Sequence, residues 1–344
     1  MKYPTISILI PCRNEVNYIE NCLNSVLQND YPPNNMEVLV IDGDSDDGTV
    51  EKIRSFEQKY SIIKLYNNQN KTVPFALNIG IKESKGSFII RIDAHSTYPT
   101  NYFTKLIEWQ LKTNADNIGG RWNTLPGNDT TIAQAIALAS SSVFGVGNAN
   151  YRLKTKIVQE VDTVPFGCYK KEVFDKIGLF DEELTRNQDD EFNARLINNG
   201  GKIFLVPEIE INYFARKNLR LLSKMNYQYG LFKPLVNRKL GKPATLRQFA
   251  PPLFVLGIIL LPIFCLISSI SCIIALSFIL TYFMLNLISS VHLSLKAKKL
   301  KLLLFFPIVF LSIHFSYGIG FIIGLLKFNI FRQKVNHINT NISR

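Results

Sequence analysis

Two long stretches without charge limit what this 344-residue chain can fold into. No Asp, Glu, Lys or Arg occurs in residues 253–295 or in residues 302–326. A helix needs about 20 apolar residues to cross a bilayer, so the first stretch is long enough for two crossings and the second for one. The sequence therefore predicts a membrane protein with two to three transmembrane helices at 251–326 and a basic tail at 327–344.

Lysine and arginine residues stand at both ends of the first uncharged stretch. If this stretch forms a hairpin that crosses the membrane twice, both basic groups lie on the cytoplasmic side, in agreement with the positive-inside rule. Residues 1–12 lack the pattern of a signal peptide, so we expect a cytoplasmic N-terminal domain in a multi-pass protein of the inner (plasma) membrane. One further crossing by residues 302–326 would place the tail outside, so either the rule fails here or this stretch is re-entrant or interfacial. The basic groups are Arg238, Lys239, Lys242 and Arg247, and Lys296, Lys298, Lys299 and Lys301.

The formal net charge of +12 fits anchoring to anionic lipid at the membrane surface. Binding to nucleic acid is not expected, because the basic residues do not gather on one stripe of the soluble part. The five cysteines are odd in number and include no Cys-x-x-Cys pair. This usage predicts reduced thiols in a reducing compartment.

Residues 1–240 have the pattern of an α/β domain. Apolar runs typical of buried strands alternate with stretches of helical spacing, which predicts a mostly parallel sheet covered by helices on both faces. An interfacial helix is expected within residues 213–248. Residues 132–151, rich in Ala, Ser and Gly, fit either a mobile loop on the acceptor side or a close-packed helix with its turn. The predicted strands are residues 6–11, 37–42, 62–66, 88–93 and 202–206.

Polar side chains follow several of these strands. Ligands of open α/β sheets bind beyond the carboxyl ends of the strands, so Glu15, Asp42, Asp44, Asp93 and His95 should meet on one rim. The last two could share a cation if their segment is extended, because alternate side chains then point the same way. An imidazole favours Mn²⁺ over Mg²⁺ in such a site. The alternative is that the strand ends in Asp only because Asp suits turns.

Two acidic segments offer further candidates. In the loop after the second strand, we expect Asp42 to contact a ligand and Ser45, Asp47 and Thr49 to make local hydrogen bonds. Asp189 opens a predicted helix, where it either serves as a general base for an attacking hydroxyl or only stabilises the helix dipole. Asp190 is the adjacent alternative for the base.

Five motifs, in order along residues 5–240, make the chain resemble the family 2 inverting glycosyltransferases of the GT-A fold. Within that family it is similar to membrane-anchored enzymes of bacterial exopolysaccharide assembly, of the succinoglycan type. The resemblance implies a Rossmann-like GT-A catalytic domain followed by C-terminal transmembrane helices. The motifs are Ser7-Ile-Leu-Ile-Pro-Cys-Arg-Asn-Glu15, Val40-Ile-Asp-Gly-Asp-Ser-Asp-Asp-Gly-Thr49, Ala76-Leu-Asn-Ile-Gly80, Ile92-Asp-Ala-His95 and Asn187-Gln-Asp-Asp-Glu-Phe-Asn-Ala-Arg-Leu196.

The resemblance also implies roles for single residues. Asp189 matches the catalytic base, with Gln188 where the family usually has Glu, and His95 stands at the second acidic position of the Asp-x-Asp motif. Asp93 and His95 would hold the divalent cation, Mn²⁺ or Mg²⁺. The Gln-x-x-Arg-Trp motif of processive synthases is absent, so processive polymerisation is not expected. The residues expected to bind the nucleotide sugar are Pro11, Arg13, Glu15, Asp42, Asp44, Lys71 and Asp93.

The expected activity is transfer of a sugar from a nucleotide-sugar donor, most simply a UDP-sugar, to a lipid-linked or oligosaccharide acceptor in cell-surface polysaccharide synthesis. The alternative is a nucleotide-sugar-binding membrane module without catalysis, which assembles or regulates a polysaccharide complex. His95 and Gln188, both unusual at their positions, keep this alternative open.

Overall fold

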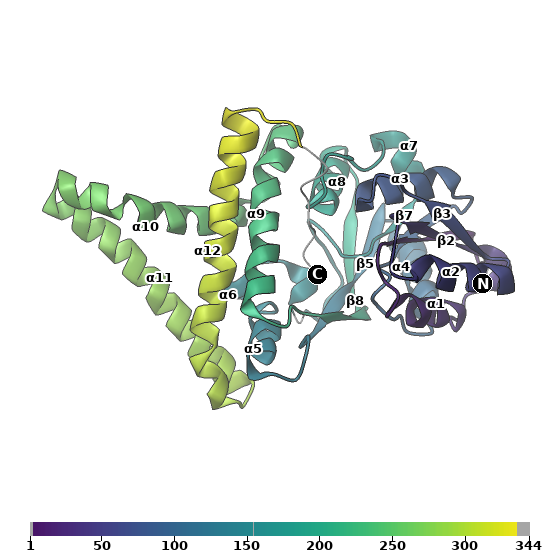
Figure 1. Ribbon diagram of the computed structural model, residues 1–344, viewed down its shortest axis with the longest axis horizontal. Helices are drawn as coiled ribbons and strands as arrows, with labels where there is room; N and C mark the ends of the chain where they lie inside the picture. Colours follow the sequence, from purple (N-terminus) through teal and green to yellow (C-terminus); the bar gives the residue numbers. More distant parts are fainter. Residues whose placement is uncertain (1–2, 154, 336–344) are drawn as a thin grey trace. The chain divides into compact units, whose positions relative to one another are not determined.

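The computed structural model describes residues 3–153 and 155–335, and their contacts form two compact units. The first unit comprises Met1–Asn123 and Lys154–Tyr213, and the second comprises Thr124–Leu153 and Phe214–Arg344 (Figure 1). The catalytic domain expected at 1–240 and the membrane region expected at 251–326 remain predictions. They divide the chain by function, whereas the two units divide it by which residues contact one another.

A mixed sheet forms the centre of the first unit, with eight strands over the described residues in the order β3-β2-β1-β4-β7-β5-β8-β6. The four strands from β3 to β4 pair in parallel, which confirms the predicted Rossmann-like half of the sheet. Beyond β4 the sheet turns antiparallel, since β7 pairs antiparallel with both β4 and β5. The strands are β1 (Ile6–Cys12), β2 (Met36–Asp42), β3 (Ile63–Asn67), β4 (Phe88–Arg91), β5 (Asn117–Leu125), β6 (Gln159–Glu160), β7 (Cys168–Lys170) and β8 (Ile203–Phe214).

Helices cover both faces of the parallel half because its strands are apolar on both sides. Ile8 and Ile10 of β1 belong to one buried cluster with Leu23 of α1, whereas Leu9 points to the other face. On that face α3 packs closely at Gly80, where an added Cβ would lie 2.9 Å from Leu9 Cδ2. The helices of this unit are α1 (Ile19–Leu27), α2 (Thr49–Lys59), α3 (Val73–Glu83), α4 (Tyr102–Thr113), α7 (Glu172–Ile177) and α8 (Gln188–Asn198).

The second unit is helical, and it settles how residues 132–151 fold. Of the two interpretations, the close-packed helix with its turn is the observed one. Ala135, Ile136 and Ala139 of α5 are buried in one cluster with Phe306 and Phe310 of α12. The helices of this unit are α5 (Thr131–Ala139), α6 (Val143–Val146), α9 (Leu219–Leu240), α10 (Ala250–Ile267), α11 (Ser269–Lys296) and α12 (Phe306–Gly324).

Helices α9 and α12 lie side by side along their lengths (Figure 1) and approach at three glycines, which we call the glycine seam. An added Cβ would lie 2.1 Å from the carbonyl oxygen of Tyr317 at Gly230, 2.2 Å from that of Tyr227 at Gly320, and 2.1 Å from that of Leu231 at Gly324. Such distances exclude any side chain, so the backbones pack directly on each other, as small residues allow in membrane helices.

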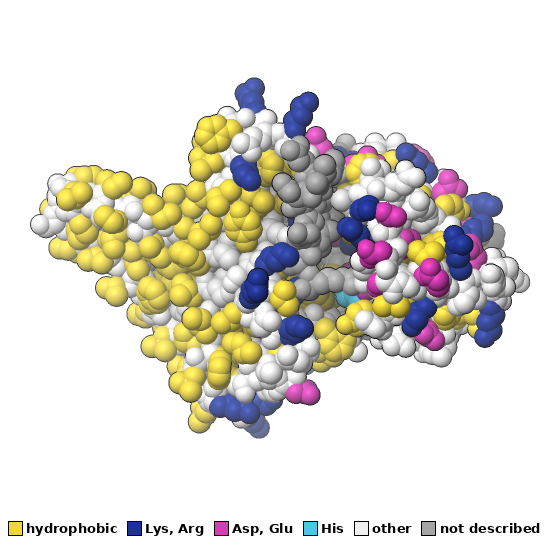
Figure 2. Space-filling model, in the orientation of Figure 1, with side chains coloured by type: hydrophobic (Ala, Val, Ile, Leu, Met, Phe, Trp, Pro, Cys, Tyr) yellow, Lys and Arg dark blue, Asp and Glu magenta, His cyan; other side chains and the backbone are white. Residues whose placement is uncertain are grey.

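Among the described residues, three helical segments are long and apolar enough to span a membrane: Leu246–Ile267, Ser269–Lys296 and Phe306–Ile330. Hydrophobic side chains cover the surface of the α10–α11 hairpin in Figure 2. The third segment differs from the hairpin in its burial. Of its most apolar 18 residues, 39% are buried inside the protein, against 6% for the corresponding residues of Ser269–Lys296.

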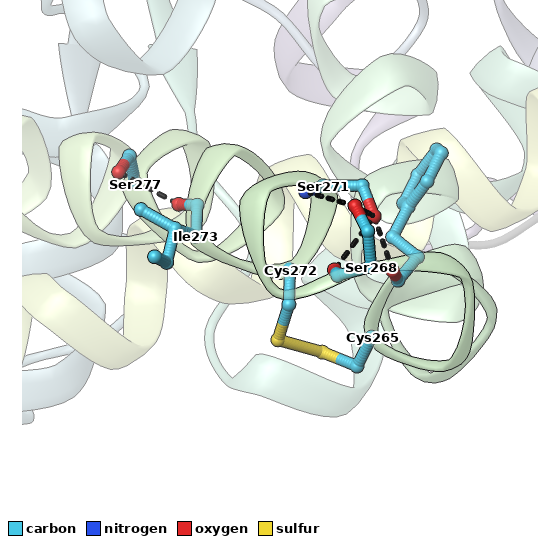
Figure 3. The surroundings of a disulfide bond; sticks show 7 residues. Cys265, Ser268, Ser271, Cys272, Ile273 and Ser277 are labelled. Carbon is cyan, nitrogen blue, oxygen red and sulfur yellow. Dashed lines mark hydrogen bonds between the residues drawn. A yellow bond between two sulfur atoms is a disulfide. The ribbon is translucent and has the colours of Figure 1, made fainter.

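The turn of the hairpin corrects the expectation that all five cysteines are reduced thiols. Cys265, near the end of α10, forms a disulfide with Cys272, near the start of α11 (Figure 3). The turn folds back at Ser268, whose hydroxyl accepts a hydrogen bond from the Ser271 N–H and caps α11. Counting cysteines could not reveal this pair, because only the tight turn brings the two residues together. Cys12, Cys22 and Cys168 are buried thiols.

Candidate active site

Asp93 and His95 follow the end of β4, but their segment is not extended as predicted. The strand ends at Arg91, and the Ser96 N–H donates to the Asp93 carbonyl to form a turn. Tyr98 fixes the start of this turn, because its hydroxyl accepts the Asp93 N–H at 2.8 Å. The turn still places the two side chains together, with 3.9 Å between Asp93 Oδ2 and His95 Nε2.

Glu15 lies on the other side of the same imidazole. Its Oε1 is 3.4 Å from His95 Nδ1, and its side chain is 3% exposed against 45% for the histidine. The two ring nitrogens of His95 thus face two different carboxylates. Glu15 was expected on the nucleotide side, and the structure places it against His95.

Arg91, which was not among the predicted site residues, joins this corner to Asp189. Its guanidinium donates to Asp189 Oδ1 through Nη1, and its Nη2 lies 3.5 Å from Asp93 Oδ1. The side chain is 10% exposed, so both carboxylates share one largely buried cation. The available signal was a single arginine inside the apolar run of β4, since a charge in a buried strand requires a partner.

Asp189 stands in the first turn of α8, which begins after Asn187 in the left-handed conformation with φ of 61°. Arg195 pairs with Glu191 one turn earlier in the helix at 2.8 Å, and it anchors the helix by donating to the carbonyl groups of Ile177 and Leu179. Desolvation raises the pKa of the Asp189 carboxyl above the ordinary aspartate range, Arg91 opposes this shift, and Asp190 and Asp93 add to it. A raised pKa improves a carboxylate as a proton acceptor.

The loop after β2 departs in part from the expectation that Ser45, Asp47 and Thr49 make mostly local hydrogen bonds. Asp47 accepts the Thr49 N–H and hydroxyl within the loop and also the Val16 N–H, and Ser45 Oγ and Thr49 Oγ1 accept the N–H groups of Asn14 and Glu15. Ser45 binds Asp42 through its N–H and its hydroxyl. Asp42 is only 3% exposed, yet it lines a cavity of about 560 Å³ together with Asp44, Ser45 and Asn67.

The remaining predicted residues surround this loop. Lys71 Nζ lies 2.6 Å from Asp44 Oδ2, and both residues have left-handed φ values. Their hydrogen bond and charge attraction lower the pKa of the Asp44 carboxyl. Arg13 is exposed and its side chain approaches Gly43, whereas Pro11 is buried inside β1. These residues therefore lie around the ends of β1 and β2.

A divalent cation would find two protein ligands here. Within residues 3–153 and 155–335, no cluster of three or more His, Cys, Asp or Glu side chains is arranged to hold a metal ion. Asp93 Oδ2 and His95 Nε2, 3.9 Å apart, nevertheless fit two positions around one cation. Mg²⁺ and related ions commonly take only one or two protein groups, with phosphate oxygens and water as the other ligands. The donor set therefore fits a cation bound together with a diphosphate.

Comparison with known proteins places this site in context. Residues 7–178 match the sequence profile of the family described as glycosyl transferase family 2. A dolichyl N-acetyl-alpha-D-glucosaminyl phosphate 3-beta-D-2,3-diacetamido-2,3-dideoxy-beta-D-glucuronosyltransferase of Methanococcus voltae is 31% identical over 94% of this chain and 98% of its own length. The succinoglycan biosynthesis protein ExoA of Rhizobium meliloti is 30% identical over 65% of this chain and 67% of its own length.

Solved structures share the fold at lower identity. The mannosyltransferase PcManGT from Pyrobaculum calidifontis, in complex with GDP-Man and Mn²⁺, has a TM-score of 0.60 and 15% identity. The similarity covers 97% of this chain and 89% of that one. At this identity the likeness concerns the fold, and it confirms the predicted α/β catalytic fold with C-terminal apolar helices.

Proposed function

The chain belongs to glycosyl transferase family 2, and we propose that it transfers a sugar, with inversion, from a nucleoside diphosphate sugar to a lipid-linked or glycan acceptor. The M. voltae relative is named for a dolichyl phosphate-linked substrate, and the R. meliloti relative for succinoglycan biosynthesis. Both names support an acceptor of the lipid-linked or glycan class. We propose a UDP-sugar as the donor, with GDP-sugars as the alternative to be tested.

In the proposed reaction, Asp189 accepts the proton of an acceptor hydroxyl as the hydroxyl oxygen attacks the anomeric carbon. The bond between that carbon and the diphosphate oxygen breaks in the same step, and the diphosphate leaves with the electron pair. Attack from the opposite side inverts the configuration, so an α-linked donor gives a β-linked product. A general base of this kind contributes about 10²- to 10⁴-fold to the rate.

The observation that carries the proposal is the position of Arg91. One guanidinium binds Asp189 on one side and approaches Asp93 on the other. The proposed base, Asp189, and the proposed diphosphate ligand side, Asp93, therefore both contact Arg91. A single-step displacement needs the base and the leaving diphosphate in the same site at the same time. The nucleoside is expected at the ends of β1 and β2, where Asp42 and Asp44 line the cavity, Lys71 pairs with Asp44, and Arg13 approaches Gly43.

Asp93 and His95 would hold the divalent cation, as their spacing allows. When bound, such a cation neutralises negative charge on the leaving diphosphate. A mixed oxygen and nitrogen donor pair favours Mn²⁺ over Mg²⁺.

We further propose that the α10–α11 hairpin crosses the inner membrane twice, with the catalytic domain in the cytoplasm. Basic residues stand at both ends of the hairpin, and the disulfide at its turn suits an oxidising compartment on the far side. α12 packs along α9, and a larger share of it is buried inside the protein than of the hairpin helices, which supports an interfacial position for this third stretch. The basic tail then stays on the cytoplasmic side.

Comparison of Asp189→Asn with Asp190→Asn tests the catalytic proposal. The full-length protein is assayed for UDP and GDP release from a panel of nucleotide sugars, with membrane lipid extract as the acceptor source. Asp189→Asn should lose transfer by at least about 10²-fold while still binding UDP, as measured by calorimetry. Full turnover by Asp189→Asn would move the base to Asp190. Donor binding without release by the unmodified protein would favour the non-catalytic alternative.

A further inference from the structure

We infer that Glu15 is a positioning residue of the cation site, acting through His95. This inference rests on the proposed function and deepens it. Glu15 would hold the His95 ring so that Nδ1 carries the proton and Nε2 presents its lone pair towards Asp93 Oδ2. One nitrogen and one oxygen would then be ready for a divalent cation before the donor arrives.

The backbone of Glu15 is held on both sides by hydrogen bonds, and its side chain is buried, so the carboxylate has a restricted position. The Glu15 N–H donates to Thr49 Oγ1 at 2.8 Å, which ties it to the start of α2. The Glu15 carbonyl accepts the N–H groups of Tyr18 and Ile19 at 2.8 and 2.9 Å at the start of α1. With a side chain only 3% exposed, Glu15 has little freedom to follow a moving ligand.

The chemistry of the ring then determines which nitrogen faces the cation. An ionised Glu15 carboxylate only accepts hydrogen bonds, so the proposal places the imidazole proton on Nδ1, the nitrogen beside Glu15. In a neutral imidazole the other nitrogen, Nε2, is then an acceptor. Nε2 lies 3.9 Å from Asp93 Oδ2, which is beyond hydrogen-bond distance. Each atom then has a lone pair directed towards the other, and a cation between the two atoms would stabilise this arrangement.

Asp93 offers only one of its oxygens to this site. Its Oδ1 lies 3.5 Å from Arg91 Nη2, which leaves Oδ2 for the cation. The backbone of Asp93 is held by Tyr98 on its N–H, and by the Cys22 thiol and the Ser96 N–H on its carbonyl. Asp93 is therefore fixed by its own contacts, and Glu15 is the group whose loss should release His95 alone. Such carboxylate partners of a ligating histidine are a common feature of metal sites.

The test measures Mn²⁺ binding to the full-length protein in detergent with UDP present, by electron paramagnetic resonance of free Mn²⁺. Glu15→Ala should weaken Mn²⁺ binding about 10- to 100-fold, as loss of a histidine's outer partner does in other metal sites. Glu15→Gln should weaken it less, because the amide oxygen still accepts the Nδ1 proton. The double variant Glu15→Ala/His95→Ala should bind no more weakly than His95→Ala, because Glu15 acts through the histidine.

A matched control and a spectroscopic measurement separate positioning from a loss of folding. Glu20→Gln changes an exposed glutamate of α1 that pairs with Lys52, and it should leave Mn²⁺ binding unchanged. The ¹⁵N shifts of His95 at a pH where it is neutral, without metal, should show protonated Nδ1 and bare Nε2 in the unmodified protein and in Glu15→Gln. If Glu15→Ala does not fold, Glu15→Gln and these shifts still decide the question.

Three outcomes would overturn the inference: Mn²⁺ binding by Glu15→Ala equal to that of the unmodified protein, a proton on Nε2 of His95, or no Mn²⁺ binding by the unmodified protein in the presence of UDP. If the unmodified protein still releases nucleoside diphosphate in that last case, the inference fails while the proposed function stands. If it neither binds UDP nor releases nucleoside diphosphate from any donor, the proposed function fails as well.

Discussion

Replacing Arg91 by methionine should shift the acid limb of the pH profile of kcat/KM towards higher pH. Arg91 lowers the pKa of the Asp189 carboxyl, while desolvation, Asp190 and Asp93 raise it. Without Arg91 the pKa of Asp189 rises further, so the carboxylate becomes protonated, and useless as a base, at a higher pH than in the unmodified protein. Activity is lost as the pH falls through that raised pKa.

The size of the effect follows from the ion pair. Opposite unit charges 4 Å apart attract each other by about 4 kcal/mol at an effective dielectric constant of 20. The Asp189 side chain is 33% exposed, and solvent screening reduces this attraction to about 2 kcal/mol. Within the acid limb, where the rate follows the ionised fraction of Asp189, kcat/KM should fall about 30-fold. The high-pH plateau should fall less.

The assay is steady-state release of nucleoside diphosphate across the pH range, with two comparison variants. Arg91→Lys keeps the charge and should retain most of the original profile. Arg121→Met removes another arginine of the first unit, paired with Glu210 on β8, and should leave the profile in place. An equal loss at every pH in Arg91→Met would show that Arg91 acts through geometry alone. An unchanged profile would refute its role altogether.

Three further predictions concern other parts of the chain. In Gly320→Ala the added Cβ would lie 2.2 Å from the Tyr227 carbonyl oxygen, so the two helices must move apart by about 1 Å. We expect a loss of about 1–3 kcal/mol in the free energy of unfolding, measured by thermal unfolding in detergent. Gly257→Ala, whose Cβ would meet only the Phe278 ring, is the control, and equal melting temperatures of the two variants would contradict the glycine seam. Removing metal with EDTA should abolish transfer, Mn²⁺ should restore it better than Mg²⁺, and His95→Asp should reverse that preference; an unchanged preference would exclude His95 as a ligand. A thiol-reactive polyethylene glycol should modify two cysteines of the membrane-embedded protein only after reduction, because Cys12, Cys22 and Cys168 are buried, and modification without reduction would contradict the disulfide.

Local pattern was enough to predict the parallel half of the sheet. Its strands β1, β2 and β4 are largely apolar and buried, and each is followed by polar residues that lie together in the first unit. In the antiparallel half, β5, β6 and β7 were missed. β6 and β7 are only two and three residues long and are held by their neighbours rather than by a pattern of their own. β8 extends to Phe214, well past the predicted strand. Its later residues alternate between buried and more exposed positions, so they do not form the continuous apolar run from which the strand was predicted.

The contacts among the candidate site residues could not be predicted from the sequence. Asp93 and His95 come together through a turn instead of an extended strand. Their spacing of two residues is compatible with either conformation, so the sequence could not distinguish them. Arg91 was invisible as a partner of Asp189 because the two residues are 98 positions apart and meet only when α8 lies beside the end of β4. The sequence likewise contains nothing that pairs Glu15 with His95.

The glycine seam also affects how this protein can be divided. A hydropathy plot suggests that a soluble fragment could end just before residue 250, after α9 and ahead of every uncharged stretch. Such a fragment would lose α12 and leave the backbone of α9 bare along Tyr227, Gly230 and Leu231. It would also lose Phe306 and Phe310, against which α5 is buried. The smallest fragment that keeps α9 covered must therefore run through Gly324, and so must carry the apolar α10–α11 hairpin with it.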